Sequence, residues 1–146
     1  MRFIVEKTMA GYSETPLVKK LGIKEGFRIA MVGAPPEFEK ELGALPAETE
    51  IVSRRNKSID LILLFAKTES DLTKDFAKLV GHLAPAGGFW VAWPKKSSGV
   101  PSNLSFAIIQ KVGLASGLVD TKICAVNDVW SGLRFVIRLK DRPGNR

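Results

Sequence analysis

The stretch that decides the fold is Gly88-Phe89-Trp90-Val91-Ala92, followed at once by Trp93-Pro94-Lys95-Lys96-Ser97-Ser98-Gly99-Val100. The first segment is a short, continuous apolar run, which predicts a buried strand. A helical pattern follows over 103–115, so the second segment is a loop that joins a strand to a helix. Because open α/β sheets bind their ligands at the carboxyl ends of their strands, this loop is a candidate binding site.

The same alternation of strand and helix extends in both directions from this stretch. Asp60-Leu61-Ile62-Leu63-Leu64-Phe65 is typical of a parallel strand that helices cover on two sides. Only Asn127 to Gly132 separate the last two apolar runs, too few residues for a crossover helix, so these two strands must pair as an antiparallel hairpin. In full, we expect strands at 27–32, 50–52, 60–65, 88–92, 119–126 and 133–139, and helices at 15–22, 37–42, 69–83 and 103–115.

These elements predict an α/β fold: a Rossmann-like, open, mostly parallel sheet of about six strands with helices on both faces and a C-terminal antiparallel hairpin strand. A chain of 146 residues is long enough to bury one core. We expect a single domain over 1–146, with an N-terminal segment at 1–26 that contains a short helix, a sheet core at 27–139 and a loose tail at 140–146.

The composition is that of a soluble globular protein, with 45% hydrophobic and 25% charged residues. No apolar run is long enough to span a bilayer, and the apolar part of the N-terminus is too short for a signal peptide. A single cysteine, Cys124, excludes an internal disulfide and a cysteine-rich zinc site. We therefore expect a cytoplasmic protein with no membrane partner and no metal; the oligomeric state is left open.

The net charge of +7 lies entirely in the second half of the chain. Residues 1–73 contain eleven Lys and Arg and eleven Asp and Glu, whereas residues 74–146 contain eleven and four. This asymmetry favours an anionic partner, although a solvated basic surface would produce the same count.

Two features resemble the class I S-adenosylmethionine-dependent methyltransferase fold: the closing antiparallel strand, and the segment Leu79-Val80-Gly81-His82-Leu83-Ala84-Pro85-Ala86-Gly87-Gly88. The second is similar to the leucine-proline-glycine-glycine stretch that members of this family have before their fifth strand. The resemblance covers 27–139 and implies the strand order 2-1-3-4-6-5. It does not extend to the cofactor site. The turn after the first strand contains Pro35-Pro36, which lack backbone donors, and Ser53-Arg54-Arg55 stands where the family has a ribose-binding acid. We therefore expect no cofactor.

The chain also resembles a family of small bacterial proteins that is defined by a domain of unknown function. The matching stretches are Gly11-Tyr12-Ser13-Glu14-Thr15-Pro16-Leu17 with Lys20-Leu21-Gly22-Ile23-Lys24, the Trp93–Val100 loop, and Val129-Trp130-Ser131-Gly132-Leu133. This resemblance implies a bacterial, cytoplasmic, stand-alone domain and implies no activity.

Two groups of residues are candidates for ligand binding. The first group lies in the loop and consists of Lys95, Lys96, Ser97, Ser98 and Gly99. Their positive charges, hydroxyl donors and backbone N–H groups can together bind an anion. The dipole of the following helix would strengthen this binding. The alternative is a polar loop in which Ser102 or Asn103 caps that helix. In the last hairpin, Trp130 can stack on a ring beside the Arg134 cation, or it can simply pack in the core.

No complete catalytic constellation is present. Cys124 has no neighbour in sequence that would lower its pKa, and His82, the only histidine, is expected at the edge of the sheet opposite Ser97. The sequence therefore favours a non-enzymatic module that binds a small anionic or phosphate-bearing ligand at the strand carboxyl ends. The alternatives are a basic nucleic-acid-binding protein and an atypical methyltransferase-like enzyme.

Overall fold

The computed structural model describes residues 15–143. The expectations for 1–14, including most of the Gly11–Leu17 stretch, and for 144–146 lie outside the described residues. In chain order the elements are α1 (Leu17–Leu21), β1 (Arg28–Val32), α2 (Phe38–Leu42), β2 (Glu50–Ile51), β3 (Ile59–Phe65), α3 (Glu69–Leu79), the 3-10 turn η1 (Val80–His82), β4 (Leu83–Pro94), the 3-10 turn η2 (Lys96–Ser98), α4 (Phe106–Ala115), β5 (Leu118–Ala125), β6 (Trp130–Ile137) and the 3-10 turn η3 (Leu139–Asp141).

The strands form one sheet of six in the order β2-β1-β3-β4-β6-β5, which confirms the expected order. The pairs β1–β2, β1–β3 and β3–β4 are parallel. Strand β6 alone runs the other way, antiparallel to both β4 and β5. The prediction of a Rossmann-like, mostly parallel sheet that ends in an antiparallel hairpin is therefore confirmed.

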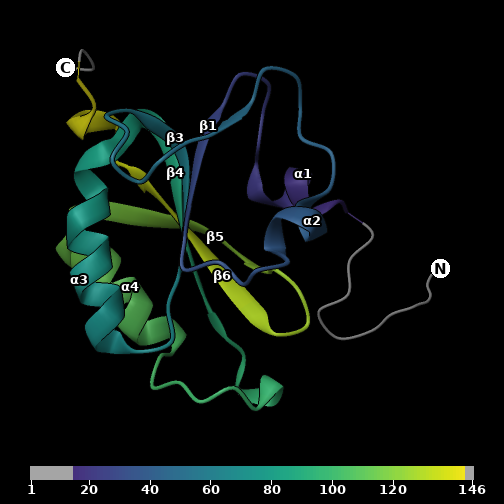
Figure 1. Ribbon diagram of the computed structural model, residues 1–146. Coiled ribbons are helices and arrows are strands. Elements are labelled where there is room, and N and C mark those ends of the chain that lie inside the picture. The colour runs from purple at the N-terminus through teal and green to yellow at the C-terminus, as the bar shows by residue number, and fades with distance from the viewer. Residues whose placement is uncertain (1–14, 144–146) are drawn as a thin grey trace.

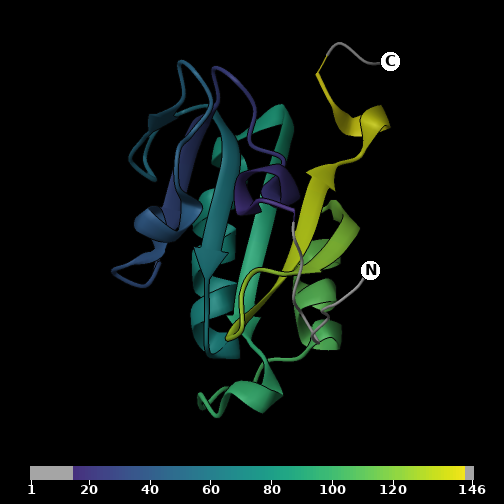
Figure 2. The same cartoon turned by 90° about the vertical axis from the view of Figure 1, so that its right-hand side faces the viewer.

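Helices cover both faces of this sheet, with α3 and α4 on one face and α1 and α2 on the other (Figure 1, Figure 2). The side chains of β4 alternate between the two cores, as a strand covered on both sides requires. Phe89 and Val91 belong to the core beneath α3 and α4, whereas Trp90 and Ala92 belong to the core beneath α1 and α2.

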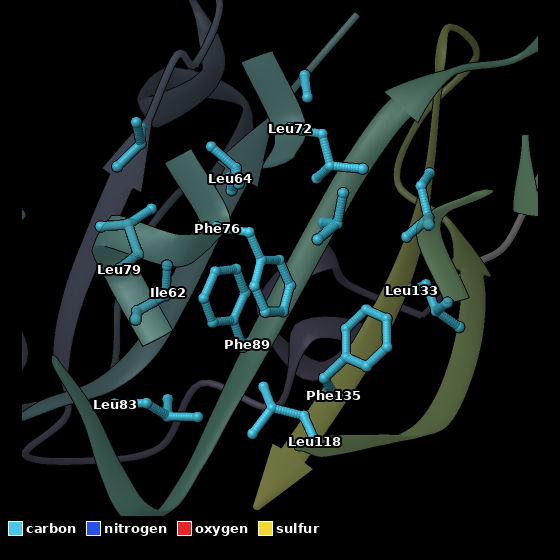
Figure 3. Packing of buried hydrophobic residues seen from close by; sticks show 14 of the residues in the cluster. Ile62, Leu64, Leu72, Phe76, Leu79, Leu83, Phe89, Leu118, Leu133 and Phe135 are labelled. Carbon is cyan, nitrogen blue, oxygen red and sulfur yellow. The ribbon is translucent and has the colours of Figure 1, made fainter. Parts of the chain in front are cut away.

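Aromatic rings dominate the centre of the α3–α4 core (Figure 3). Phe76 of α3 stacks on Phe89 of β4 with ring centroids 4.3 Å apart, and it meets Phe135 of β6 edge-on at 5.7 Å. All three rings have no exposed surface. Because α3 contacts two strands through one ring, its position over the sheet is fixed.

On the opposite face, β4 also holds α1. The buried Trp90 donates its indole N–H to the carbonyl oxygen of Leu21 at 2.9 Å. Leu21 is the last residue of α1, where a carbonyl has no partner within the helix. Gly22 follows in the left-handed conformation, with φ of 80°, and ends the helix as its position in the sequence predicts.

Three elements begin three or more residues away from their predicted starts, and α3 ends at Leu79 rather than at 83. Strand β4 begins at Leu83, which pairs with Ile59 before the strand bulges and resumes with Gly88 opposite Leu61. Strand β6 begins at Trp130 rather than at 133, because its first residues extend the pairing with β4 up to Pro94.

The third difference is the start of α4. This helix begins at Phe106 because Ser105, rather than Ser102 or Asn103, accepts a hydrogen bond at its N-terminus, from the Ile108 N–H at 3.4 Å. Beyond β6 the chain forms η3, after which the Arg142 side chain donates from Nε to the Ile137 carbonyl oxygen at 3.0 Å.

Candidate functional site

The connections that leave the carboxyl ends of β1, β3 and β4 meet at one edge of the sheet, together with the β5–β6 turn at 126–129. In Figure 2 this edge is the lower one, where the loop that contains η2 projects. It is the edge at which open α/β sheets bind ligands. The predicted site residues Lys95 to Gly99 and Trp130 lie there.

Within the Lys95–Gly99 loop, the Ser98 side chain stabilises the turn through hydrogen bonds to the backbone. Its hydroxyl donates to the Lys95 carbonyl oxygen at 2.6 Å and accepts from the Val100 N–H at 3.1 Å. The N–H groups of Ser98 and Gly99 donate to the carbonyl oxygens of Lys95 and Lys96. With these donors occupied, the groups of the loop that remain for a ligand are the side chains of Lys95, Lys96 and Ser97 and the N–H groups of Lys96 and Ser97, which have no partner within residues 15–143.

The residues after this loop tie it to the start of α3. Ser102 donates its hydroxyl to the Lys67 carbonyl oxygen at 2.6 Å, and Asn103 Oδ1 accepts from the Glu69 N–H at 2.9 Å. Asn103 therefore caps α3 rather than α4. The expected dipole of α4 lies six residues beyond Gly99, at Ser105, and not directly behind the lysines.

Trp130 is 7% exposed and packs edge-on against Phe65 with ring centroids 5.0 Å apart. Phe65 in turn contacts Phe38 of α2 at 4.9 Å. Within residues 15–143, the Trp130 indole N–H has no hydrogen-bond acceptor. The ring is thus a core residue whose polar atom the described protein does not satisfy.

Trp130 also lines a cleft of about 600 Å³ between α2 and the β5–β6 turn, which we call the α2–hairpin cleft. Both of these segments lie on the face turned to the viewer in Figure 2. Its apolar lining comes from Pro35, Phe38, Val129 and Trp130, and its polar lining comes from Glu37, Lys40, Glu41 and Asn127.

Asn127 joins the two sides of this cleft. Its Nδ2 donates to Glu41 Oε1 at 3.0 Å, and its Oδ1 accepts from the N–H groups of Val129 and Trp130, each at 2.9 Å. Our sequence reasoning missed the α2 residues of the cleft, because they lie nearly 90 positions from Asn127 in the chain. The signal that was available is Asn127-Asp128, a pair typical of a turn whose side chain bonds its own backbone.

Arg134 does not share this site with Trp130. Four residues along a strand correspond to about 13 Å, so Arg134 lies well down the sheet from the carboxyl edge. Its guanidinium covers Gly88, where an added Cβ would lie 2.8 Å from Nε, and its Nη1 donates to Thr121 Oγ1 at 3.1 Å. Burial, and then repulsion from Arg142, lowers the pKa of Arg134.

The β1–α2 turn borders a smaller pocket of about 350 Å³, where the methyltransferase resemblance places the cofactor. Pro35 and Pro36 line it and offer no N–H, and Glu39 adds negative charge. Gly33 has φ of 73° and lies so close to β3 that an added Cβ would be 2.9 Å from the Phe65 carbonyl oxygen. At the end of β2 the pocket is lined by Ile51, whereas Arg54 and Arg55, which the sequence placed at the position of the family's acid, line a different pocket. These residues do not fit S-adenosylmethionine.

Other candidate chemistry is sparse in the described part of the chain. Cys124 is half-buried, and burial raises the pKa of its thiol, against the opposing effect of Lys20 and Lys122. Residues 15–143 contain no group of three or more His, Cys, Asp or Glu side chains placed to hold a metal. They also include no helix of the length and apolar character needed to span a membrane.

Neither a protein-family model nor a curated protein matches the sequence. Solved structures do match. A SAM dependent methyltransferase from Aquifex aeolicus, 14% identical, aligns over 84% of this chain and 88% of its own with a TM-score of 0.59. A ribosomal protein L11 methylase from Lactobacillus delbrueckii subsp. bulgaricus, 13% identical, covers 84% and 75% with a TM-score of 0.59. Magnesium protoporphyrin IX methyltransferase from Synechocystis PCC 6803, 9% identical, covers 84% and 78% with a TM-score of 0.54.

These likenesses show that the chain has the methyltransferase fold, as its strand order and hairpin predict. They overturn one expectation from the sequence. The sequence favours a module without enzymatic activity, yet several of the solved structures that share its fold are methyltransferases, which points toward an enzyme. That expectation is wrong on this finding. It depended on the missing cofactor residues and on the lack of a complete catalytic constellation in the sequence, and both are arguments from what local sequence does not show.

Proposed function

We propose that this methyltransferase-fold chain binds a small molecule with an apolar or aromatic part and an anionic group. The apolar part lies in the α2–hairpin cleft, and the anionic group lies at Lys95 and Lys96. The observation that carries the proposal is the position of Trp130. It lines the cleft, and its partner across the sheet, Pro94, directly precedes Lys95. The aromatic lining and the cationic loop are therefore adjacent.

The charges of the cleft support this division of the ligand. Glu37 and Glu41 line the cleft together with a single cation, Lys40, so an anionic group inside it would meet net negative charge. Lys95 and Lys96 have no ion pair within the described residues. A ligand whose anionic group extends past Val129 would reach them, since the Lys95 N–H donates to the Val129 carbonyl oxygen at 2.7 Å.

The cleft also has the size and rigidity of a small-molecule site. Its volume of about 600 Å³ lies in the usual range for such pockets, about 300–1,000 Å³. The hydrogen bond from Asn127 to Glu41 holds its two walls together before any ligand arrives. Preorganisation of this kind lowers the entropic cost of binding.

A titration with 2-naphthoate and its neutral analogue 2-naphthamide separates the two parts of the proposed site. Fragments of this size bind with Kd of about 1 mM. We expect 2-naphthoate to shift the Trp130 indole resonance in NMR spectra and to bind about tenfold more tightly than the amide. The doubly substituted Lys95→Gln, Lys96→Gln protein should lose this preference for the charged ligand and keep the binding of the ring.

Lys111→Gln is the matched control, since Lys111 is exposed on α4, on the opposite face of the sheet from α2. Its preference for 2-naphthoate should equal that of the wild type. Val129→Trp, which fills the cleft, should abolish the binding of both compounds. An unshifted Trp130 resonance at saturating ligand, or an unchanged charge preference in the double variant, would count against the proposal.

The shared fold favours a second candidate, an atypical methyltransferase-like enzyme whose cofactor contacts differ from those of the family. The observation behind it is the match to methyltransferases over 84% of the chain. Incubation of the purified protein and a small-molecule extract with methyl-labelled S-adenosylmethionine tests it. Transfer of label that saturates with cofactor would support this candidate, and no transfer above a heat-inactivated control would argue against it.

A further inference from the structure

A basic pocket of about 450 Å³ lies at the other edge of the sheet, at the amino ends of the parallel strands. The loop that follows β2 forms one wall, and the C-terminal half of α3 with η1 forms the other. Both segments lie toward the upper edge in Figure 1. The polar residues that line the pocket are Arg54, Arg55, Lys74, Asp75, Lys78 and His82.

The pocket contains more positive charge than its acidic side chain, Asp75, can neutralise. Arg54 approaches Asp75, with 3.4 Å between Nη2 and Oδ1. Within the part of the chain that the structure describes, Arg55, Lys74 and Lys78 have no ion pair. Lys74 and Lys78 are four residues apart on one helix, a spacing at which like charges repel. A bound anion would relieve this repulsion.

The macrodipole of α3 accounts for only part of this charge. A helix C-terminus favours cations in its last turn, which explains Lys78. The macrodipole does not explain Arg55, because this residue lies on the separate loop after β2. With Arg55, the pocket has cations on both of its walls.

The walls are held together by hydrogen bonds. The ring nitrogen Nδ1 of His82 lies 2.7 Å from the Asn56 carbonyl oxygen, and because a carbonyl can only accept, Nδ1 donates. The loop is itself an ordered turn, in which the Asn56 N–H donates to the Ser53 carbonyl oxygen at 3.0 Å and the Arg55 N–H to Ser53 Oγ at 3.1 Å. The cations on the two walls are therefore presented by fixed backbone.

We propose that this pocket binds a small anion that carries two or more phosphate groups. Lys74 and Lys78 are separated by about one helical turn, or about 6 Å along the axis, which is enough to contact neighbouring phosphates. Arg55 adds a planar guanidinium that can bind phosphate oxygens in pairs. The volume suits a small molecule, and the site is independent of the α2–hairpin cleft at the opposite edge.

Isothermal titration calorimetry with sodium tripolyphosphate, and with inorganic phosphate as the single-phosphate comparison, tests this proposal. We expect saturable binding of tripolyphosphate at least tenfold tighter than that of phosphate. Arg55→Gln and Lys78→Gln should each weaken it about tenfold. Lys19→Gln, which removes the same charge from the exposed side of α1, should bind as the wild type does.

Melting temperatures without ligand show whether each variant folds, and exposed lysines contribute little to folding. Three results would overturn the proposal. One is no heat with millimolar tripolyphosphate, and another is an equal loss of affinity in Lys19→Gln. The third is binding of a 20-nucleotide DNA that tripolyphosphate does not displace and whose affinity falls steeply with salt, since that would identify a nucleic-acid surface instead.

Discussion

At the scale of single residues, Gly113 is a position where α4 packs directly on the sheet, against Phe135. A Cβ added there would lie 2.0 Å from Cε1 of Phe135, a ring with no exposed surface. Alanine is favoured over glycine in a helix by about 1 kcal/mol, but overpacking a core costs about 1–3 kcal/mol. Because Phe135 is also held by Phe76, we expect the clash to prevail and Gly113→Ala to destabilise the protein.

The midpoint of urea unfolding measures this effect. Gly81→Ala is the matched control, because an added Cβ there meets nothing within 4 Å. It should leave the midpoint unchanged or raise it slightly, since it restricts the unfolded chain. Equal midpoints for the two variants would contradict the prediction, because they would show that Phe135 can move to accommodate the added methyl group.

Cys124 makes a second prediction at this scale. Burial raises the pKa of its thiol, so the folded protein should react with iodoacetamide at pH 8.5 more slowly than the protein in urea. Lys20 and Lys122 oppose the shift, and their replacement by Met should slow the reaction further. A group whose pKa is raised on folding contributes stability below its unfolded pKa and loses it as the pH rises through the folded pKa. The free energy of unfolding should therefore fall in that alkaline range; equal alkylation rates in both states would contradict the assignment.

At the scale of elements, Asn103 connects the segment after the Lys95–Gly99 loop to α3. Its Oδ1 accepts from the Glu69 N–H in the first turn of that helix, where Thr68 already accepts from Asp71 at 3.1 Å. Loss of a cap costs about 1 kcal/mol, so Asn103→Ala should lower the free energy of unfolding by that amount. Hydrogen exchange should also speed up at Glu69, while exchange at Ile108 in α4 stays unchanged. Faster hydrogen exchange at Ile108 and not at Glu69 would contradict this, because it would show that Asn103 caps α4 instead of α3.

The same residue illustrates why some elements could be predicted and others not. The continuous apolar runs of β3 and β4 indicate buried strands by themselves, so these two strands could be predicted from local sequence. The caps do not, since Ser102, Asn103 and Ser105 are all good N-cap residues and only tertiary contacts decide among them. The start of β6 at Trp130 is likewise set by pairing with Pro94, a residue 36 positions earlier.

At the scale of the whole molecule, the order of the strands was predictable from the sequence, and the geometry of the candidate site was predictable only in part. The short 127–132 connection required an antiparallel pair, and the resemblance to methyltransferases supplied the rest of the order. The sequence also indicated the carboxyl edge and the lysine loop. It could not indicate that Ser98 satisfies its own loop, that Arg134 lies far from Trp130, or that α2 and Asn127 enclose a cleft, because each depends on packing between distant segments.

The prediction about cofactor binding also concerns the whole molecule. The fold suggests that the protein binds S-adenosylmethionine, whereas the residues of the β1–α2 turn argue against it. The fold is shared with S-adenosylmethionine-dependent enzymes, yet Pro35 and Pro36 remove two backbone donors, and Ile51 rather than an acid lines the pocket at the end of β2. We expect calorimetry to detect no saturable binding of S-adenosylmethionine at 1 mM, a concentration that corresponds to about −4 kcal/mol of binding free energy.

If these three residues are the cause, their replacement should restore affinity. The triple variant Pro35→Gly, Pro36→Gly, Ile51→Asp returns two N–H groups and a carboxylate to the pocket beside the β1–α2 turn, and we expect it to bind the cofactor measurably while the parent does not. Circular dichroism would show that the variant still folds. A micromolar Kd for the parent would refute the prediction and support the second candidate function, because the fold would then hold its cofactor through contacts other than this turn.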